Sequence, residues 1–211
     1  MNLLKYTCFL ICLIFFCAPP VIADDDVSGI DGIWSPSWRS KDNLAPQWIF
    51  TKDGRVTHTF GTVIDLKYEI NGGQIKSVVL SPDHSTVSRE EMPKDFQIDG
   101  DTLTENPRTA GRKMIMKRIG KPTVGAPPLV GEWTFKDSTG NPAYLRYAST
   151  GFAQLTIPFR TYTGTYRVDR NALLVQLQGQ PPMTLNYRWE KGLLVLPDAQ
   201  GKESRYLKFA F

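Results

Sequence analysis

Cysteine is scarce in this chain, and its positions limit the possible chemistry. Cys8, Cys12 and Cys17 all lie within the first 23 residues, in a segment that is predicted to be removed. The remaining chain then has no disulfide, no thiol nucleophile and no cysteine-ligated metal. It also has no N-x-[ST] acceptor site for glycosylation. The sequence therefore predicts a core that holds the fold without covalent cross-links.

An excess of charge of one sign is also missing. Lysine and arginine number 25 against 21 aspartate and glutamate residues, a formal net charge of +4, which falls to +3 without Lys5. The charged fraction of 22% and the hydrophobic fraction of 41% are typical of a folded globular protein. So small a positive excess predicts no nucleic-acid partner and no anionic membrane surface.

Residues that carry catalysis or hold metals are few. The chain has two histidines, His58 and His84, and no HExxH or paired metal-ligand spacing, so we expect no metal and no other cofactor. There is no G-x-S-x-G elbow, phosphate loop or dinucleotide fingerprint. His58 falls on the polar phase of an alternating segment, which predicts a surface position. The sequence favours a protein that is not an enzyme.

The first 23 residues follow the pattern of a signal peptide. Lys5 precedes an apolar run over residues 6–17, Pro19 and Pro20 end the run, and Ala23 offers a small residue for cleavage. The run is about a dozen residues long, which is short for a bilayer span and makes a retained anchor the weaker alternative. We expect export to the periplasm or secretion, with no stable membrane span in the mature chain.

Two segments of the mature chain carry the same landmarks in the same order, which is typical of an internal repeat. The offset between them is 97 to 99 residues up to Val79 and 91 from Phe96 onward. The first copy therefore contains an insertion of about seven residues within residues 81–93. We predict a first domain at residues 29–119, a Pro-rich linker at 120–128 and a second domain at 129–211. The matched landmarks are Trp34 with Trp133, Gly54 with Gly151, Tyr68 with Tyr166, Ile75 with Leu173, Leu103 with Leu194 and Lys117 with Lys208.

Alternation of apolar and polar residues around glycine turns predicts an all-β fold. Each copy offers about seven short strands, and residues 85–92 are the only candidate for a helical turn or two. An antiparallel meander that closes into a small barrel leaves no exposed edge. We therefore expect two tandem small meander barrels. The pattern leaves open whether the copies form separate barrels or one shared sheet.

The order of these landmarks resembles the small bacterial lipocalin-like domains over most of both copies. The first copy departs from the pattern at Asp65-Leu66-Lys67-Tyr68, which lacks the glycine before the tyrosine, and at its insertion. The resemblance implies an up-and-down barrel and a binding role, and it implies no catalytic residues. It is carried by Asp31-Gly32-Ile33-Trp34, by Gly131-Glu132-Trp133 and by Gly164-Thr165-Tyr166-Arg167-Val168.

The features that only the first copy has supply the candidate binding residues. Trp38 and Trp48 offer flat apolar surface for a ligand, while His84 and Arg89 belong to the insertion. We expect a non-catalytic binding or interaction protein of the bacterial envelope with a surface or rim site. Its partner would be an envelope protein or a small apolar or glycan ligand.

Two alternatives stay open at this point. The ending of residues 206–211 resembles the terminal aromatic signal of outer-membrane barrels, although most strands look shorter than the 9 to 11 residues such a barrel needs. The second alternative is a hydrolase-type enzyme whose site lies in the insertion at residues 81–93, around His84 and Ser85.

Overall fold

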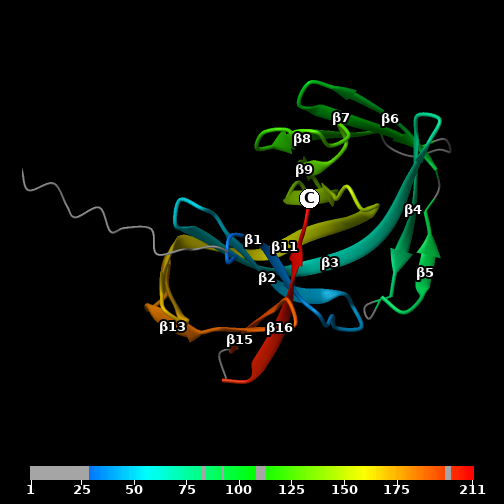
Figure 1. Ribbon diagram of the computed structural model, residues 1–211. Helices are drawn as coiled ribbons and strands as arrows, with labels where there is room; N and C mark the ends of the chain where they lie inside the picture. Colours follow the sequence, from blue (N-terminus) through cyan, green and yellow to red (C-terminus); the bar gives the residue numbers. More distant parts are fainter. Residues whose placement is uncertain (1–28, 82–83, 92, 108–112, 198–200) are drawn as a thin grey trace, which may run out of the picture.

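The computed structural model describes residues 29–81, 84–91, 93–107, 113–197 and 201–211. The all-β prediction is confirmed, since these residues form strands, turns and irregular segments that join in one antiparallel sheet (Figure 1). Nothing in this described part is a helix long and apolar enough to cross a membrane. The predicted signal segment, residues 1–23, lies outside the described residues.

Sixteen strands make up the sheet, and tight turns join most of them. Gly54 and Gly151 adopt φ values of 78° and 79°, the left-handed conformation that the turns before β3 and β11 require. The helical expectation for residues 85–92 is wrong, because β5 lies there and pairs with the end of β4. The strands are β1 (Gly32–Pro36), β2 (Leu44–Phe50), β3 (Arg55–Asn71), β4 (Gln74–Leu80), β5 (Val87–Glu90), β6 (Lys94–Asp99), β7 (Thr102–Pro107), β8 (Met114–Ile119), β9 (Gly131–Lys136), β10 (Pro142–Tyr147), β11 (Phe152–Asp169), β12 (Ala172–Leu177), β13 (Met183–Asn186), β14 (Arg188–Glu190), β15 (Leu193–Pro197) and β16 (Glu203–Phe209).

Two long strands form the centre of the molecule. β3 and β11 pair along 13 residue pairs, from Lys67 opposite Phe152 to Arg55 opposite Thr165 (Figure 1). Each strand changes its other neighbour along its length, because β3 pairs first with β2 and then with β4, and β11 pairs first with β10 and then with β12. The two strands therefore belong to two lobes at once.

The hydrogen-bonded order closes into a ring on one side of this pair and forms an arc on the other side. The ring runs from β3 through β4, β6, β7, β8, β9 and β10 to β11, and we call it the Trp133 lobe after the tryptophan in its core. The arc runs from β3 through β2, β1, β16 and β15 to β14, and from β11 through β12 to β13. Tyr187 joins β13 to β14 along the chain, and these two strands do not pair. We call this arc the Trp34 lobe.

The two predicted copies share this one sheet. The Trp34 lobe takes β1, β2 and the first half of β3 from residues 29–119 and its other strands from residues 129–211. The Trp133 lobe takes β9, β10 and the first half of β11 from residues 129–211 and its other strands from residues 29–119. No strand lies within residues 120–128. The question that the sequence left open is thus answered in favour of a shared sheet.

Equivalent contacts recur in the two lobes at the spacing of the predicted repeat. The backbone N–H of Tyr68 donates to Gly151 O at 2.7 Å, and that of Tyr166 donates to Gly54 O at 2.8 Å. Each tyrosine hydroxyl also donates to a carbonyl of the same turn. In each predicted copy, a tyrosine of the long strand therefore binds the hairpin turn of the other predicted copy.

A buried tryptophan begins each core. The indole N–H groups of Trp34 and Trp133 donate to carbonyls four residues earlier, at 2.7 and 2.9 Å. Lys208 Nζ lies 5.4 Å from the Trp34 ring centre, and the Arg118 guanidinium lies 4.1 Å from that of Trp133. The predicted match of Lys117 with Lys208 is therefore wrong by one residue, because the sheet register places Arg118 opposite Trp133 as it places Lys208 opposite Trp34.

Candidate functional site

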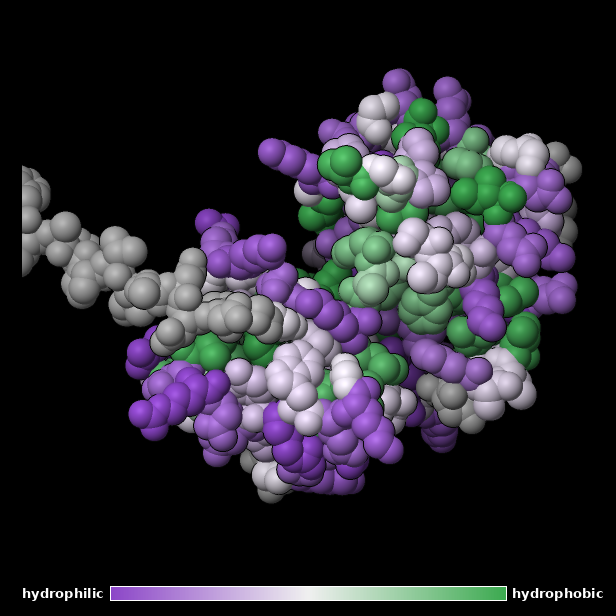
Figure 2. Space-filling model, in the orientation of Figure 1, coloured by the Kyte–Doolittle hydropathy of each residue, from purple (hydrophilic) through white to green (hydrophobic). Residues whose placement is uncertain are grey.

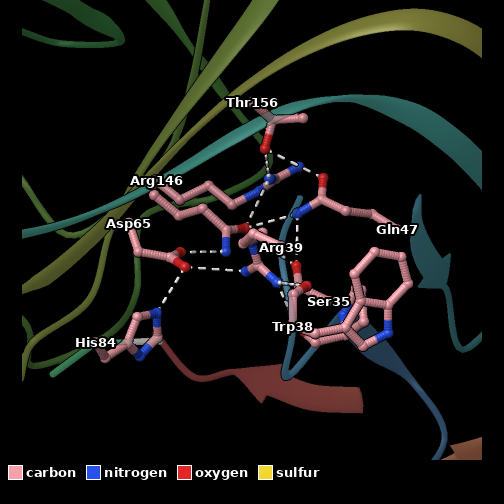
Figure 3. Close-up of polar contacts among 10 residues, drawn as sticks. Ser35, Trp38, Arg39, Gln47, Asp65, His84, Arg146 and Thr156 are labelled. Atoms are coloured by element: carbon pink, nitrogen blue, oxygen red, sulfur yellow. Dashed lines mark hydrogen bonds and ion pairs between the residues drawn. The ribbon is translucent and has the colours of Figure 1, made fainter. Parts of the chain in front are cut away.

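The structure separates the four predicted site residues. Trp38 follows β1 and is 47% exposed, and its carbonyl accepts a hydrogen bond from Arg39 at 3.0 Å. The Arg39 side chain also contacts Asp65, and His84 contacts the same Asp65 oxygen, so Trp38 and His84 are linked through Arg39 and Asp65 (Figure 3). Trp48 is buried in the Trp34 lobe, and Arg89 lies on β5 at the Trp133 lobe.

A polar cluster lies where the outer faces of the two lobes meet (Figure 3). Its side chains on the strands alternate with core residues, so they point away from both cores, and Arg39 and His84 come from the segments after β1 and β4. A small apolar cluster of Ile33, Ala148 and Phe209 forms beside it. On the face shown in Figure 2, hydrophilic side chains project around both lobes. The interlobe polar cluster consists of Ser35, Arg39, Gln47, Asp65, His84, Arg146, Gln154 and Thr156.

Asp65 is the acidic residue of this cluster, and its side chain is only 3% exposed. Arg39 Nη2 and His84 Nε2 lie 2.9 and 2.7 Å from Oδ2, and Gln154 Nε2 donates to Oδ1 at 2.8 Å. Burial alone would raise the pKa of Asp65, but the contacts with His84, Arg39 and Gln154 lower it overall. The carboxylate thus stays charged and forms a buried ion pair with Arg39, whose side chain is 4% exposed.

The rest of the cluster cross-links strands of both lobes. The Gln47 amide donates to Ser35 Oγ at 2.6 Å and to Gln154 Oε1 at 2.7 Å. Arg146 Nη1 donates to Thr156 Oγ1 at 2.9 Å. These bonds join β1, β2, β10 and β11, so the cluster fixes how the two lobes sit against each other.

The Trp133 lobe contains a partly enclosed cavity of about 150 Å³ inside its ring. Depressions of about 400 to 520 Å³ also exist, but they are more open to solvent. Arg89, Glu91 and Lys94 line the enclosed cavity, and Arg89 Nη2 lies 2.5 Å from Glu91 Oε1. Arg89 is therefore the one predicted site residue that borders this cavity. Its apolar lining includes Leu66, Val79, Met114, Phe135, Leu145 and Leu155.

The Trp34 lobe is filled at the corresponding place. Leu145 and Leu155 are cross-strand partners on β10 and β11, and the equivalent partners on β2 and β3 are Trp48 and His58. The Trp48 and His58 rings stack with their centres 4.1 Å apart. The surface prediction for His58 is wrong, because its ring is mostly buried, and this burial lowers its pKa from 6.5 to about 4. Two rings thus occupy the space that two leucines leave open.

An acidic residue that sequence reasoning missed contacts two residues that line the cavity. Glu105 is 1% exposed, accepts a hydrogen bond from the Tyr147 hydroxyl at 2.7 Å, and pairs with Lys94 Nζ at 3.2 Å. Burial and the neighbouring Glu105 raise the pKa of Tyr147 well above its usual value. The available signal was that Glu105 comes two residues after Leu103, which places both on the inner face of β7.

Neither metal-binding clusters nor known relatives identify a function. Within the described ranges, no group of three or more His, Cys, Asp or Glu side chains is placed to hold a metal ion. Comparison of the chain with protein-family models, with curated proteins and with solved structures finds no match. The site must therefore be interpreted from its own geometry.

Proposed function

We propose that this protein is an exported, non-catalytic binding protein that holds a small apolar ligand in the cavity of the Trp133 lobe. The observation that carries the proposal is the difference between the lobes at one position. The Trp34 lobe fills it with the stacked Trp48 and His58 rings, and the Trp133 lobe leaves about 150 Å³ between leucines. An apolar lining with a few charged groups at its edge is the usual composition of a small-molecule site.

The size of the cavity defines the ligand. An apolar cavity of about 150 Å³ is large enough for a benzene ring. Leaving such a volume empty costs about 24 cal/mol per Å³, or at most about 4 kcal/mol here, since the cavity is partly open. A ligand that fills it would offset part of this cost. We therefore expect a single ring, a short branched chain, or one such group of a larger molecule.

The alternatives have less support from the geometry. His84 and Asp65 resemble part of a catalytic dyad, but Asp65 also holds Arg39 and Gln154, so its contacts explain a structural role. The two apolar cores lie inside the lobes, whereas an outer-membrane barrel needs an apolar band on its outside. An envelope protein or a glycan as partner would have to use the outer surface instead of the cavity.

Filling the cavity tests the proposal directly. Replacing Leu145 by Trp and Leu155 by His copies the pair found in the Trp34 lobe. Benzene should raise the thermal midpoint of the natural protein in proportion to its concentration and leave that of the double variant unchanged. Leu145→Met with Leu155→Met conserves volume and serves as the control that still binds. A natural protein whose midpoint and amide NMR spectrum do not respond to benzene would contradict the proposal.

Export is tested separately from binding. Mass spectrometry of the exported protein should find Asp24 as its first residue, following cleavage after Ala23. An exported or membrane-retained chain that still begins at Met1 would contradict the predicted signal peptide.

A further inference from the structure

One residue that lines the cavity of the Trp133 lobe is polar where the Trp34 lobe has an apolar residue. Ser77 lines the cavity from β4 and is opposite Tyr68 in the β3–β4 pairing. The sheet register identifies its equivalent as Val175, which is opposite Tyr166 in the β11–β12 pairing. Val175 belongs to the apolar core of the Trp34 lobe and is 2% exposed. The strand therefore does not require a hydroxyl group at this position.

The Ser77 hydroxyl has no hydrogen-bond partner among the described residues. Ile75 and Val79, two positions away on each side, are buried in the same lobe, so the Ser77 side chain also points inward. Ser77 is 9% exposed, and its Oγ is not one of the fully enclosed polar atoms that lack a partner. This oxygen therefore keeps accessible surface where Ser77 lines the cavity. A hydroxyl so placed has given up a hydrogen bond that water would supply.

The other polar side chains that line the cavity already have partners. Arg89 Nη2 lies 2.5 Å from Glu91 Oε1. Lys94 Nζ and the Tyr147 hydroxyl contact the same carboxylate, that of Glu105, at 3.2 and 2.7 Å. Because these charges are paired within the protein, a charged ligand group would be buried without a free counter-ion. Within the described lining of the cavity, the serine is thus the one polar side chain left for a ligand, and a neutral group suits it.

Resting on the proposed function, we propose that the ligand combines an apolar body of about one ring with a single neutral hydroxyl group that hydrogen-bonds with Ser77 Oγ. A serine hydroxyl can both donate and accept, so a ligand hydroxyl can pair with it in either direction. The pairing replaces the hydrogen bonds that both groups lose when they leave water. Phenol has this chemistry, and benzene is the same ring without the hydroxyl.

Two variants of nearly the same shape isolate the hydroxyl. Ser77→Val copies the residue of the Trp34 lobe, and Ser77→Thr differs from it by keeping a hydroxyl. NMR titration with phenol and with benzene gives the ratio of their affinities for each protein. The phenol-to-benzene ratio should be about tenfold higher for the natural protein and Ser77→Thr than for Ser77→Val, because beside valine the phenol hydroxyl is buried without a partner. Benzene itself should bind both variants equally.

The outcomes separate this inference from the proposed function. Binding of neither molecule to the natural protein overturns both. Binding of benzene together with a phenol-to-benzene ratio that is the same in Ser77→Val and Ser77→Thr overturns the role of Ser77 and leaves the apolar cavity as the site. If either variant fails to fold, as judged by circular dichroism, or no longer binds benzene, Ser77→Ala replaces both. A ratio in Ser77→Ala that equals that of the natural protein then overturns the inference.

Discussion

The stack of His58 on Trp48 should make the protein sensitive to mild acid. Burial lowers the pKa of His58 from 6.5 to about 4, so the folded protein resists protonation of this ring. The unfolded chain takes up the proton near pH 6.5. As the pH falls from 6.5 towards 4, protons bind the unfolded state first, and the free energy of unfolding decreases.

The size of this loss follows from the two pKa values. Linkage gives a loss of about 2 kcal/mol at pH 5 and about 3 kcal/mol at pH 4, relative to pH 8. His58→Leu places at this position the residue that its equivalent, Leu155, has in the Trp133 lobe. Urea unfolding of both proteins at pH 8, 7, 6, 5 and 4 gives the free energy of unfolding at each pH. Subtracting the two curves removes the contributions of all other titrating groups.

The difference in the free energy of unfolding between the natural protein and His58→Leu, followed against pH, tests whether His58 is buried and neutral. The natural protein should lose stability relative to His58→Leu only below about pH 6.5, with a slope approaching 1.4 kcal/mol per pH unit. Parallel curves for the natural protein and His58→Leu between pH 7 and 4 would refute the buried, neutral state of His58.

Two further predictions concern stability, and urea unfolding measures both. Asp65→Asn leaves the Arg39 guanidinium buried beside a neutral partner and should lower the free energy of unfolding by about 3 to 5 kcal/mol. Asp65→Leu with Arg39→Met removes both charges and should lower it much less. A loss below about 1 kcal/mol in Asp65→Asn would contradict the buried ion pair. Gly164→Ala puts a Cβ atom against the carbonyl oxygen of Gln176 and should cost about 3 kcal/mol, while Thr165→Ala at the neighbouring exposed position should change little.

The positions of the strands could be predicted from the sequence better than which strands pair with each other. Alternation and turn glycines predict the hairpins around Gly54 and Gly151, and both are present. The sequence suggested about seven short strands in each copy, but β3 is one strand of 17 residues. Its middle part pairs with β11, from the other copy, and no local pattern distinguishes a partner nearby in the chain from one a hundred residues away. The shared sheet was therefore beyond local pattern reasoning.

The site was less predictable because it depends on this pairing. Trp48 was chosen for its flat apolar surface, yet opposite His58 it completes a core. Leu145 and Leu155 look like ordinary core residues in the sequence, and only the register shows that they replace that bulky pair. Arg89 borders the cavity, in agreement with the rim position that we expected for the insertion. Glu105 could have been noticed in the sequence, because it is an acidic residue at an inward-facing position of its strand.

The exchange of strands between the lobes has a consequence for the predicted domains. If residues 29–119 and 129–211 were independent folding units, each would need a complete core of its own. Instead, the Trp34 core combines Trp34 and Phe50 with Leu173 and Leu194, and the Trp133 core is divided between the ranges in the same way. A fragment of either range would expose half of two apolar cores and one edge of a long central strand.

We therefore expect neither fragment to fold alone and the two together to restore the fold. Residues 24–125 and 126–211, expressed separately, should each lack a cooperative urea transition, and mixing them should give a stoichiometric complex with the near-ultraviolet circular dichroism of the intact chain. The cut lies in the linker, where no strand is broken, so failure to fold reflects the missing partner strands and not a damaged sheet. Cleaving the intact protein at an engineered protease site in this linker provides the control, since both halves are then already paired. A cooperative transition in either isolated fragment would show that its strands close a barrel without the other copy, and the strand exchange would then not be what holds the lobes together.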